Sequence, residues 1–208
     1  MNRCVIVGGA PIGRYERIRS LLRPGDFMIY CDSGLNHEKR LCRSPDLVVG
    51  DFDSHERPQS AREILVLPHE KDDTDTFFAA KEAIRRGFDE FLLIGALGGR
   101  FDHSLGNLSL LLYLDSKGKR ALLADDYSEM EIVGRQPLEI PPECPYFSLL
   151  AVAGEAHGVV VEDALYPLNG AVISPDFAYG VSNEPLPGKS ARVSVGEGRL
   201  LLVRIRKE

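Results

Sequence analysis

The chain has 208 residues, of which 44% are hydrophobic and 27% charged, so it has enough apolar material for a folded core and is neither disordered nor fibrous. Its 25 Lys and Arg against 31 Asp and Glu give a formal net charge of −6, which argues against a broad basic surface for nucleic acid. The longest apolar runs fall far short of the roughly 20 residues that a membrane helix requires. We therefore expect a globular protein that binds neither nucleic acid nor membranes.

The compartment is indicated by the N-terminus and by the cysteines. The first apolar stretch stops at Gly8, without the longer hydrophobic segment and cleavage site of a secretory signal. The four cysteines are Cys4, Cys31, Cys42 and Cys144. They show no C-x-x-C spacing, so the sequence indicates neither a zinc site nor a disulfide framework. We expect a cytoplasmic protein with reduced thiols.

The first 125 residues alternate short apolar runs with longer stretches of helical periodicity. Continuous apolar runs are typical of strands buried on both faces, and they occur at Cys4–Val7, Phe27–Cys31, Leu47–Val49, Ile64–Leu67, Phe91–Ile94 and Ala121–Leu123. Apolar residues spaced by three and four predict helices over Thr76–Arg86 and over His103–Leu114, the second with a polar Asn107 among them. The alternation predicts a Rossmann-like α/β domain, a mostly parallel sheet with flanking helices.

The sequence changes in character after about residue 125, where eight prolines separate short runs rich in Val, Leu and Tyr. These runs predict strands at Ile132–Val133, Tyr146–Ala151, Gly158–Val161, Ala171–Ile173, Arg192–Val195 and Leu200–Ile205. The turn Gly196-Glu197-Gly198 predicts a hairpin between the last two strands. We expect two domains, the α/β domain over residues 1–125 and a small all-β domain, a sandwich or a barrel, over residues 126–208.

The aspartates are concentrated in the first domain, which has 12 of the 15, and several come directly after a predicted strand. They follow four strands in turn: Asp32, then Asp51 and Asp53, then Asp72, Asp73 and Asp75, and then Asp102. In a parallel sheet, these loops emerge together at the carboxyl edge, where ligands of open α/β sheets bind.

Carboxylates on four converging loops would repel one another unless a cation lay among them, and hard divalent ions prefer such oxygen ligands. Mg²⁺ is the natural candidate, and it commonly bridges protein carboxylates to substrate phosphates. Lys71 and Arg100 lie beside the carboxylates and suit phosphate oxygens. Glycines allow close approach of the backbone to a ligand at Gly8-Gly9, Gly34 and Gly98-Gly99. The pattern therefore predicts a Mg²⁺–phosphate site.

Plainer roles remain open for single residues of this pattern. An aspartate after a strand is more often a turn former or a helix cap, and Asp75 and Asp102 precede predicted helices. Four histidines have no ligand spacing and are expected at the surface or in packing: His37, His55, His69 and His157. His103 is favoured as a site residue by its neighbours.

Four motifs, in this order, resemble those of thiamine pyrophosphokinases: Cys-Asp-Ser-Gly, Gly-Asp-Phe-Asp-Ser, Lys-Asp-Asp-Thr-Asp and Gly-Gly-Arg-Phe-Asp-His. The segments Leu-Tyr-Pro-Leu and Val-Ser-Asn resemble the family's C-terminal pattern, so the likeness runs from residue 4 to about residue 205. It implies an α/β catalytic domain followed by a β-sandwich domain, in a homodimer that holds thiamine near the subunit interface. It also implies transfer of the terminal diphosphate of ATP to the hydroxyethyl oxygen of thiamine, which gives thiamine diphosphate and AMP.

The resemblance also implies roles for individual residues. The catalytic set is Asp51, Asp53, Asp75, Arg100 and Asp102, of which the first three match the family's magnesium–diphosphate site and either of Asp75 and Asp102 could accept the alcohol proton. The ATP-binding set is Asp32, Gly34, Asn36, Lys71, Asp72, Thr74, Gly99 and His103. Thiamine carries a cationic ring and a flat aminopyrimidine, which call for an aromatic face and hydrogen-bonding groups. Those types are supplied by Tyr166, Ser182 and Asn183.

Three alternatives remain open. A diphosphokinase for another flat heterocyclic alcohol would keep the aspartate loops and change the C-terminal pocket. A nucleotide- or thiamine-binding sensor would keep binding and lack turnover. A plain metal-binding α/β module would bind ATP only through Mg²⁺, and thiamine would add nothing.

Overall fold

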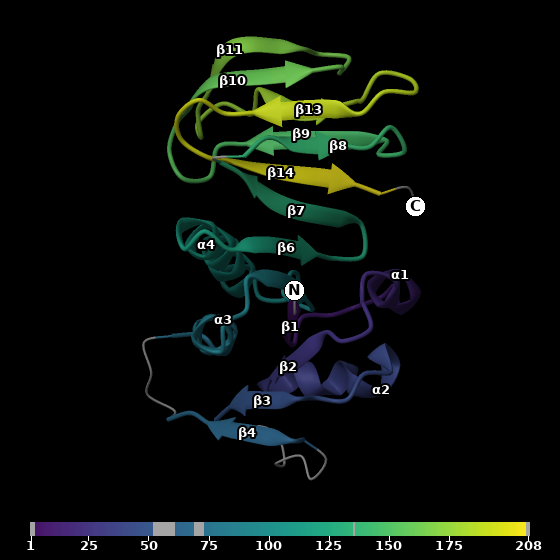
Figure 1. Cartoon of the computed structure of the whole chain (residues 1–208), viewed down its shortest axis with the longest axis vertical. Coiled ribbons are helices and arrows are strands. Elements are labelled where there is room, and N and C mark those ends of the chain that lie inside the picture. The colour runs from purple at the N-terminus through teal and green to yellow at the C-terminus, as the bar shows by residue number, and fades with distance from the viewer. Residues whose placement is uncertain (1–2, 52–60, 69–72, 135, 207–208) are drawn as a thin grey trace. The chain divides into compact units, whose positions relative to one another are not determined.

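The computed structural model describes residues 3–51, 61–68, 73–134 and 136–206 (Figure 1). The chain divides into two units, Met1–Asp126 and Tyr127–Glu208. Within the described residues, no helix has both the length and the apolar character needed to cross a membrane.

The first unit is built on parallel strands in the order β6-β5-β1-β2-β3-β4. In chain order the strands are β1 (Arg3–Val7), β2 (Phe27–Cys31), β3 (Leu47–Gly50), β4 (Glu63–Val66), β5 (Glu90–Ile94) and β6 (Arg120–Ala124). The residues of β1 and β3 are buried throughout, which explains the continuous apolar runs Cys4–Val7 and Leu47–Val49 within them. The predicted α/β class is confirmed, and all six predicted strands are present.

Helices flank these strands. They are α1 (Tyr15–Ser20), the 3₁₀ helix η1 (Asp32–His37), α2 (Glu38–Leu41), α3 (Asp75–Arg85) and α4 (Phe101–Ser116). Ile18 of α1 and Leu41 of α2 pack in one core with Val5 and Val7 of β1. Helix α3 packs against β1, β2 and β3. The two predicted helices correspond to α3 and α4, whereas α1, η1 and α2 are too short to give a periodic signal.

The second unit consists of antiparallel strands in two groups, ordered β12-β9-β14-β7 and β11-β10-β13-β8. The strands are β7 (Ser128–Val133), β8 (Leu138–Ile140), β9 (Tyr146–Leu150), β10 (Ala156–Glu162), β11 (Leu168–Ile173), β12 (Gly180–Asn183), β13 (Ala191–Ser194) and β14 (Leu200–Ile205). Phe147 and Leu202 from one group share a core with Val161 and Val193 from the other. This unit is therefore a small sandwich, as the resemblance implied.

The predicted hairpin between the last two strands is wrong. Strand β13 pairs with β10 and β8, whereas β14 pairs with β7 and β9 in the other group. The intervening turn instead pairs with His157 of β10, whose backbone N donates to the carbonyl O of Glu197 at 2.8 Å. The glycine turn therefore carries the chain from one layer of the sandwich to the other.

Candidate active site

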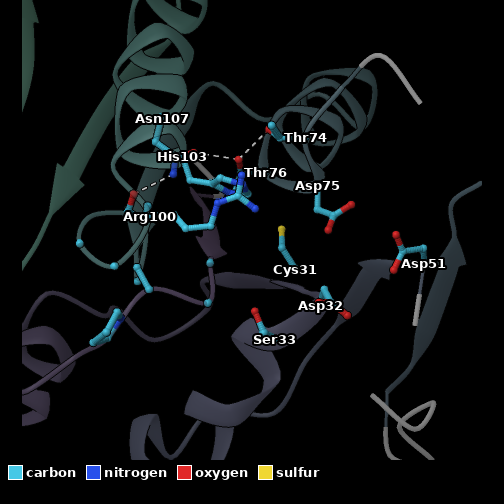
Figure 2. A pocket seen from close by; sticks show the side chains of 18 residues that line it. Cys31, Asp32, Ser33, Asp51, Thr74, Asp75, Thr76, Arg100, His103 and Asn107 are labelled. Atoms are coloured by element: carbon cyan, nitrogen blue, oxygen red, sulfur yellow. Dashed lines mark hydrogen bonds between the residues drawn. The ribbon is translucent and has the colours of Figure 1, made fainter. Parts of the chain in front are cut away.

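A cavity of about 480 Å³ opens in the first unit where the parallel strands end at their carboxyl edge. Its walls come from the segments at the ends of β1, β2, β3 and β5, from the first turn of α3 and from the first two turns of α4 (Figure 2). The lining residues are Gly8, Gly9, Ala10, Pro11, Cys31, Asp32, Ser33, Asp51, Thr74, Asp75, Thr76, Gly95, Ala96, Gly98, Gly99, Arg100, His103 and Asn107.

Three carboxylates gather at one end of this cavity. Figure 2 shows those of Asp51 and Asp75 pointing toward one another, with Asp32 close by and the guanidinium of Arg100 directed into the cavity from the far side. Oδ1 of Asp32 and Oδ1 of Asp75 are buried. The cavity therefore has an acidic end that suits a cation and a basic side that suits phosphate oxygens.

Asp32 occupies a strained backbone position at the end of β2. Its φ of 40° is in the left-handed region, which non-glycine residues seldom adopt. Gly50, at the end of β3, lies directly against it, and a Cβ on Gly50 would be 3.2 Å from Cα of Asp32. Close packing of these two strand ends thus sets the direction in which the Asp32 carboxylate leaves the sheet.

Glycines bring the loops behind the cavity into backbone contact. A Cβ on Gly8 would lie 2.5 Å from the carbonyl O of Gly95, and a Cβ on Gly34 would lie 2.2 Å from the carbonyl O of Val7. Neither position has room for a side chain. Gly34 therefore contributes to the site through packing, and it is not among the residues that line the cavity.

The start of α3 orients Asp75. Thr74 caps the helix, because its Oγ1 accepts a hydrogen bond from the backbone N of Phe77 at 3.3 Å. Asp75 is the first helical residue, where a carboxylate is favoured by the helix dipole. Asp75 is thus not the cap of this helix, and its side chain is directed into the cavity (Figure 2).

A buried amide connects α3 to the neighbouring elements. Asn107 of α4 accepts a hydrogen bond at Oδ1 from Oγ1 of Thr76 at 2.8 Å and donates from Nδ2 to the carbonyl O of Ala96 at 2.7 Å. Asn107 is buried, so these bonds also satisfy a polar group inside the protein. The sequence signalled Asn107 as a polar residue on an apolar helix and gave no indication of its partners.

Arg100 and Asp102 form an exposed pair at the start of α4. Arg100 donates from Nη2 to Oδ2 of Asp102 at 2.5 Å and from Nε to Oδ1 at 3.2 Å, and the backbone N of His103 also donates to Oδ1 at 3.0 Å. The hydrogen bond from Arg100 lowers the pKa of Asp102 to about 2. Helix α4 begins at Phe101, so Asp102 lies inside the first turn and not at the capping position.

The cavity brings together most of the expected ATP-site residues that the structure describes. Those that line it are Asp32, Asp51, Thr74, Asp75, Gly99, Arg100 and His103. Asn36 is an exposed residue of η1 and is not among the lining residues. Three expected residues lie outside the described part of the chain: Asp53, Lys71 and Asp72. Sequence reasoning did not single out Cys31, Ser33 or Thr76 as lining residues.

The donor set at the acidic end fits Mg²⁺ by its chemistry. Among the described residues, no group of three His, Cys, Asp or Glu side chains is close enough to hold a metal ion by itself. Mg²⁺ commonly takes one or two carboxylates and completes its shell with water and substrate phosphates. Asp51 and Asp75 supply carboxylates of this kind at a cavity wall that also carries Arg100.

A second cavity, also of about 480 Å³, lies within the second unit. Its lining residues are Leu149, Leu165, Tyr166, Pro167, Leu168, Tyr179, Gly180, Val181 and Asn183. Two of the three expected thiamine residues are therefore in its wall. The third, Ser182, has a left-handed φ of 60°, and its backbone N donates to Oγ of Ser148 at 3.1 Å. Tyr179 is an aromatic residue of this wall that sequence reasoning missed.

Relatives of this chain were found by sequence and by structure. Thiamine pyrophosphokinase of Bacillus subtilis (strain 168) is 29% identical over 168 residues, which cover 77% of this chain and 78% of that protein. Thiamine pyrophosphokinase 1 of Oryza sativa subsp. japonica is 37% identical over 102 residues, which cover 43% of this chain and 38% of that protein. The crystal structure of thiamine pyrophosphokinase from Bacillus subtilis shares the fold, with a TM-score of 0.85, 23% identity and 100% of both chains covered.

A second crystal structure, of thiamin pyrophosphokinase from Geobacillus thermodenitrificans, has a TM-score of 0.83 at 25% identity and covers 100% of this chain and 99% of that one. Two family models match adjoining parts of the chain. The model of the thiamin pyrophosphokinase catalytic domain matches residues 18–123, and the model of the thiamin pyrophosphokinase vitamin B1 binding domain matches residues 135–200. The chain belongs to the thiamine pyrophosphokinase family.

Proposed function

We propose that this chain transfers the terminal diphosphate of ATP to the hydroxyl of thiamine and releases AMP, as the family's name implies. The observation that supports this most directly is the first cavity, in which carboxylates face a guanidinium at the carboxyl edge of the parallel strands. This is the place where open α/β sheets bind their ligands. The second cavity supplies aromatic walls for a flat ring.

In our proposal, the catalytic residues of the first cavity hold ATP through its phosphates. Asp51 and Asp75, together with Asp53, would hold Mg²⁺, which when bound neutralises charge on the phosphate oxygens. Arg100 would donate to the nonbridging oxygens of the transferred group, since its planar fork suits them. Asp32, the remaining carboxylate of the wall, would orient the nucleotide.

Diphosphoryl transfer requires positioning more than covalent chemistry from the protein. The thiamine hydroxyl oxygen forms a bond to the β-phosphorus, and the bond from that phosphorus to the oxygen shared with the α-phosphate breaks, so that AMP leaves. The hydroxyl proton passes to a base or to water. Asp102 is a poor base because Arg100 holds its pKa near 2, and we assign it instead to orienting Arg100. Asp75 is assigned to Mg²⁺ in this proposal, so water is the simpler acceptor of the proton.

Thiamine would bind at the second cavity, where the Tyr166 ring offers a face to a cationic thiazolium or to the aminopyrimidine.

Two further expectations, about oligomeric state and cellular compartment, belong to the same proposal. Exposed aromatic side chains at Tyr166, Phe177 and Tyr179 are typical of a contact surface, which supports a homodimer. The four cysteines are free and Cys42 is exposed, which suits the reducing cytoplasm.

The test is an incubation of purified protein with ATP, Mg²⁺ and thiamine, with the products identified by mass spectrometry and phosphorus NMR. We expect thiamine diphosphate and AMP in equal amounts, and neither product when EDTA is present. ADP with thiamine monophosphate would contradict the proposal, because it would mean attack at the γ-phosphorus. Absence of turnover despite Mg²⁺-dependent ATP binding would favour another heterocyclic alcohol or a sensor.

A further inference from the structure

We propose that Asn183 is a positioning residue for the second cavity: its buried amide fixes the backbone of Tyr166 and thereby holds the Tyr166 ring in the cavity wall. This inference rests on the proposed function for its link to thiamine. It differs from the expectation that Asn183 itself contacts thiamine. The role follows from three hydrogen bonds, from the local path of the chain and from the exposure of the Tyr166 ring.

The side chain of Asn183 is occupied by backbone groups. Its Oδ1 accepts hydrogen bonds from the backbone N of Tyr166 at 3.0 Å and of Glu184 at 2.8 Å, and its Nδ2 donates to the carbonyl O of Tyr166 at 2.8 Å. A primary amide has two acceptor and two donor positions, so three of the four are used. Asn183 is 7% exposed, and an amide buried to this degree depends on such partners.

The amide continues a short stretch of backbone pairing. Ala164 and Pro185 form an antiparallel bridge, and the backbone N of Leu165 donates to the carbonyl O of Glu184 at 2.8 Å. At the next residue, Tyr166, the side chain of Asn183 replaces the backbone of a neighbouring strand. It forms hydrogen bonds with both the backbone N–H and the carbonyl of Tyr166. Pro167 follows and has no N–H. The Asn183 amide is thus what fixes the segment at Tyr166.

The backbone fixed by Asn183 determines the position of the Tyr166 ring. This residue is 61% exposed, although it lines the cavity together with Leu165 and Tyr179. An exposed ring receives little packing, so its place in the wall depends on the backbone that carries it. A binding group held in place before the ligand arrives loses less conformational freedom on binding, which strengthens the affinity. Loss of the amide is therefore expected to weaken thiamine binding through Tyr166.

The test is a double-mutant cycle on the full-length protein, with thiamine KM, ATP KM and kcat measured for Asn183→Ala, Tyr166→Ala and the double variant. We expect Asn183→Ala to raise thiamine KM about tenfold, the size of one or two lost hydrogen bonds, while ATP KM and kcat change by less than about twofold. In the Tyr166→Ala background, Asn183→Ala should add almost nothing. Effects that multiply in the double variant would overturn the inference, because they would indicate a direct contact with thiamine.

Two controls separate positioning from loss of fold. Asn169→Ala removes an exposed asparagine from β11 of the same unit and should leave all three constants unchanged. If Asn183→Ala lowers the yield of folded protein, Asn183→Asp serves instead. It keeps the acceptor for the N–H groups of Tyr166 and Glu184 but places an oxygen against the Tyr166 carbonyl, so the same rise in thiamine KM is expected.

A second readout needs no turnover, so it remains informative if the proposed function fails. Backbone hydrogen exchange of the ligand-free protein, followed by NMR, should show the Tyr166 amide exchanging at least about tenfold faster in Asn183→Ala. The Leu165 amide, which is bonded to the Glu184 carbonyl, should keep its rate. Unchanged exchange at Tyr166 would overturn the positioning role even where thiamine is turned over normally.

Discussion

Arg100 and Asp102 are paired through two hydrogen bonds, with Nη2 of Arg100 2.5 Å from Oδ2 of Asp102 and Nε 3.2 Å from Oδ1. Both residues are in the one catalytic set expected from the sequence, and the hydrogen-bonded pair distinguishes their roles. Because the guanidinium holds the carboxyl pKa near 2, Asp102 is ionised at neutral pH and has little tendency to take up a proton. Its effect on turnover should therefore pass through the orientation of Arg100.

Asp102→Asn is expected to lower kcat by about tenfold and to leave the shape of the pH profile between pH 5 and 9 unchanged. A general base contributes about 10²- to 10⁴-fold, which is more than the loosening of a neighbouring arginine should cost. The check is kcat over that pH range for wild type and variant. A loss above about 1000-fold, or disappearance of the acidic limb, would show that Asp102 is a base after all.

His37 ties the glycine-containing loop of the first cavity to η1. Its Nδ1 lies 2.6 Å from Oη of Tyr15, and its Nε2 lies 3.0 Å from the carbonyl O of Ala10, which lines the cavity. The ring is buried, and burial lowers its pKa, so it is neutral at pH 7. A neutral ring accepts from Tyr15 at Nδ1 and donates to Ala10 at Nε2.

We expect His37→Ala to raise ATP KM about fivefold and to leave thiamine KM unchanged, since Ala10 borders only the first cavity among the described pockets. His157→Ala, which removes an exposed imidazole from β10, is the matched control and should be silent. Steady-state kinetics with each substrate varied in turn provides the check. An equal rise in both KM values would argue against a role confined to the ATP cavity.

Glu82 of α3 connects two arginines at the C-terminal end of the helix, the last helical residue Arg85 and the C-cap residue Arg86. Its carboxylate accepts from Arg85 and Arg86, each at 2.7 Å, and the bond from Arg85 is the main reason that its pKa falls from 4.5 to about 2. A carboxyl group whose pKa is lower in the folded than in the unfolded state stabilises the folded protein. This contribution is complete at pH values above the pKa of the unfolded state. That contribution is lost as the pH falls from about 4.5 to about 2.

The free energy of unfolding of Glu82→Gln should therefore depend less on pH between 4.5 and 2.5 than that of wild type. Urea unfolding at several pH values in this window measures the difference. Glu139→Gln, which removes an exposed carboxylate from β8, should retain the wild-type slope. Parallel curves for wild type and Glu82→Gln would contradict the assignment.

Two glycines of the first unit should respond to alanine in opposite directions. At Gly34 a Cβ would lie 2.2 Å from the carbonyl O of Val7, so Gly34→Ala is expected to destabilise the fold by at least about 2 kcal/mol. At Gly106, inside α4, a Cβ meets no atom within 4 Å, and Gly106→Ala should stabilise by about 0.5–1 kcal/mol. Urea unfolding tests both, and stabilisation by Gly34→Ala would show that the loops are not in contact.

The sequence predicted the first unit well because its central strands, such as β1 and β3, are buried on both faces and therefore contain continuous apolar runs. It also predicted which carboxylates gather, since position after a parallel strand determines the edge at which a side chain emerges. Asp32, Asp51 and Asp75 illustrate this. The short elements were missed because a helix such as α1, with six residues, has no periodicity to detect.

What could not be predicted depends on partners that are distant in sequence. The turn after Ser194 has the composition of a hairpin, and only the competing strands of the sandwich direct β14 to the other layer. Asn183 could be identified as a polar residue of interest, but its partner is the backbone of Tyr166, 17 positions away. Every residue has a similar backbone, so the residue type of the partner does not indicate that such a contact is made.

The most direct test of the acidic end compares two neighbouring aspartates. Asp75 is directed into the first cavity, whereas Asp73 binds Nζ of Lys81 at 3.0 and 2.8 Å and is absent from the cavity lining. Asp75→Asn removes a carboxylate from the proposed Mg²⁺–diphosphate site, and Asp73→Asn removes the same charge two residues away. The pair therefore separates metal binding from a general change in charge.

The measurement is turnover as a function of Mg²⁺ concentration for wild type, Asp75→Asn and Asp73→Asn. We predict that Asp75→Asn lowers kcat about 100-fold or more and raises the Mg²⁺ concentration for half-maximal rate, since a ligand of the ion is lost. Asp73→Asn should stay within about twofold of wild type in both quantities. Wild-type behaviour of Asp75→Asn, or equal losses in the two variants, would contradict a metal site at the carboxyl edge of the sheet.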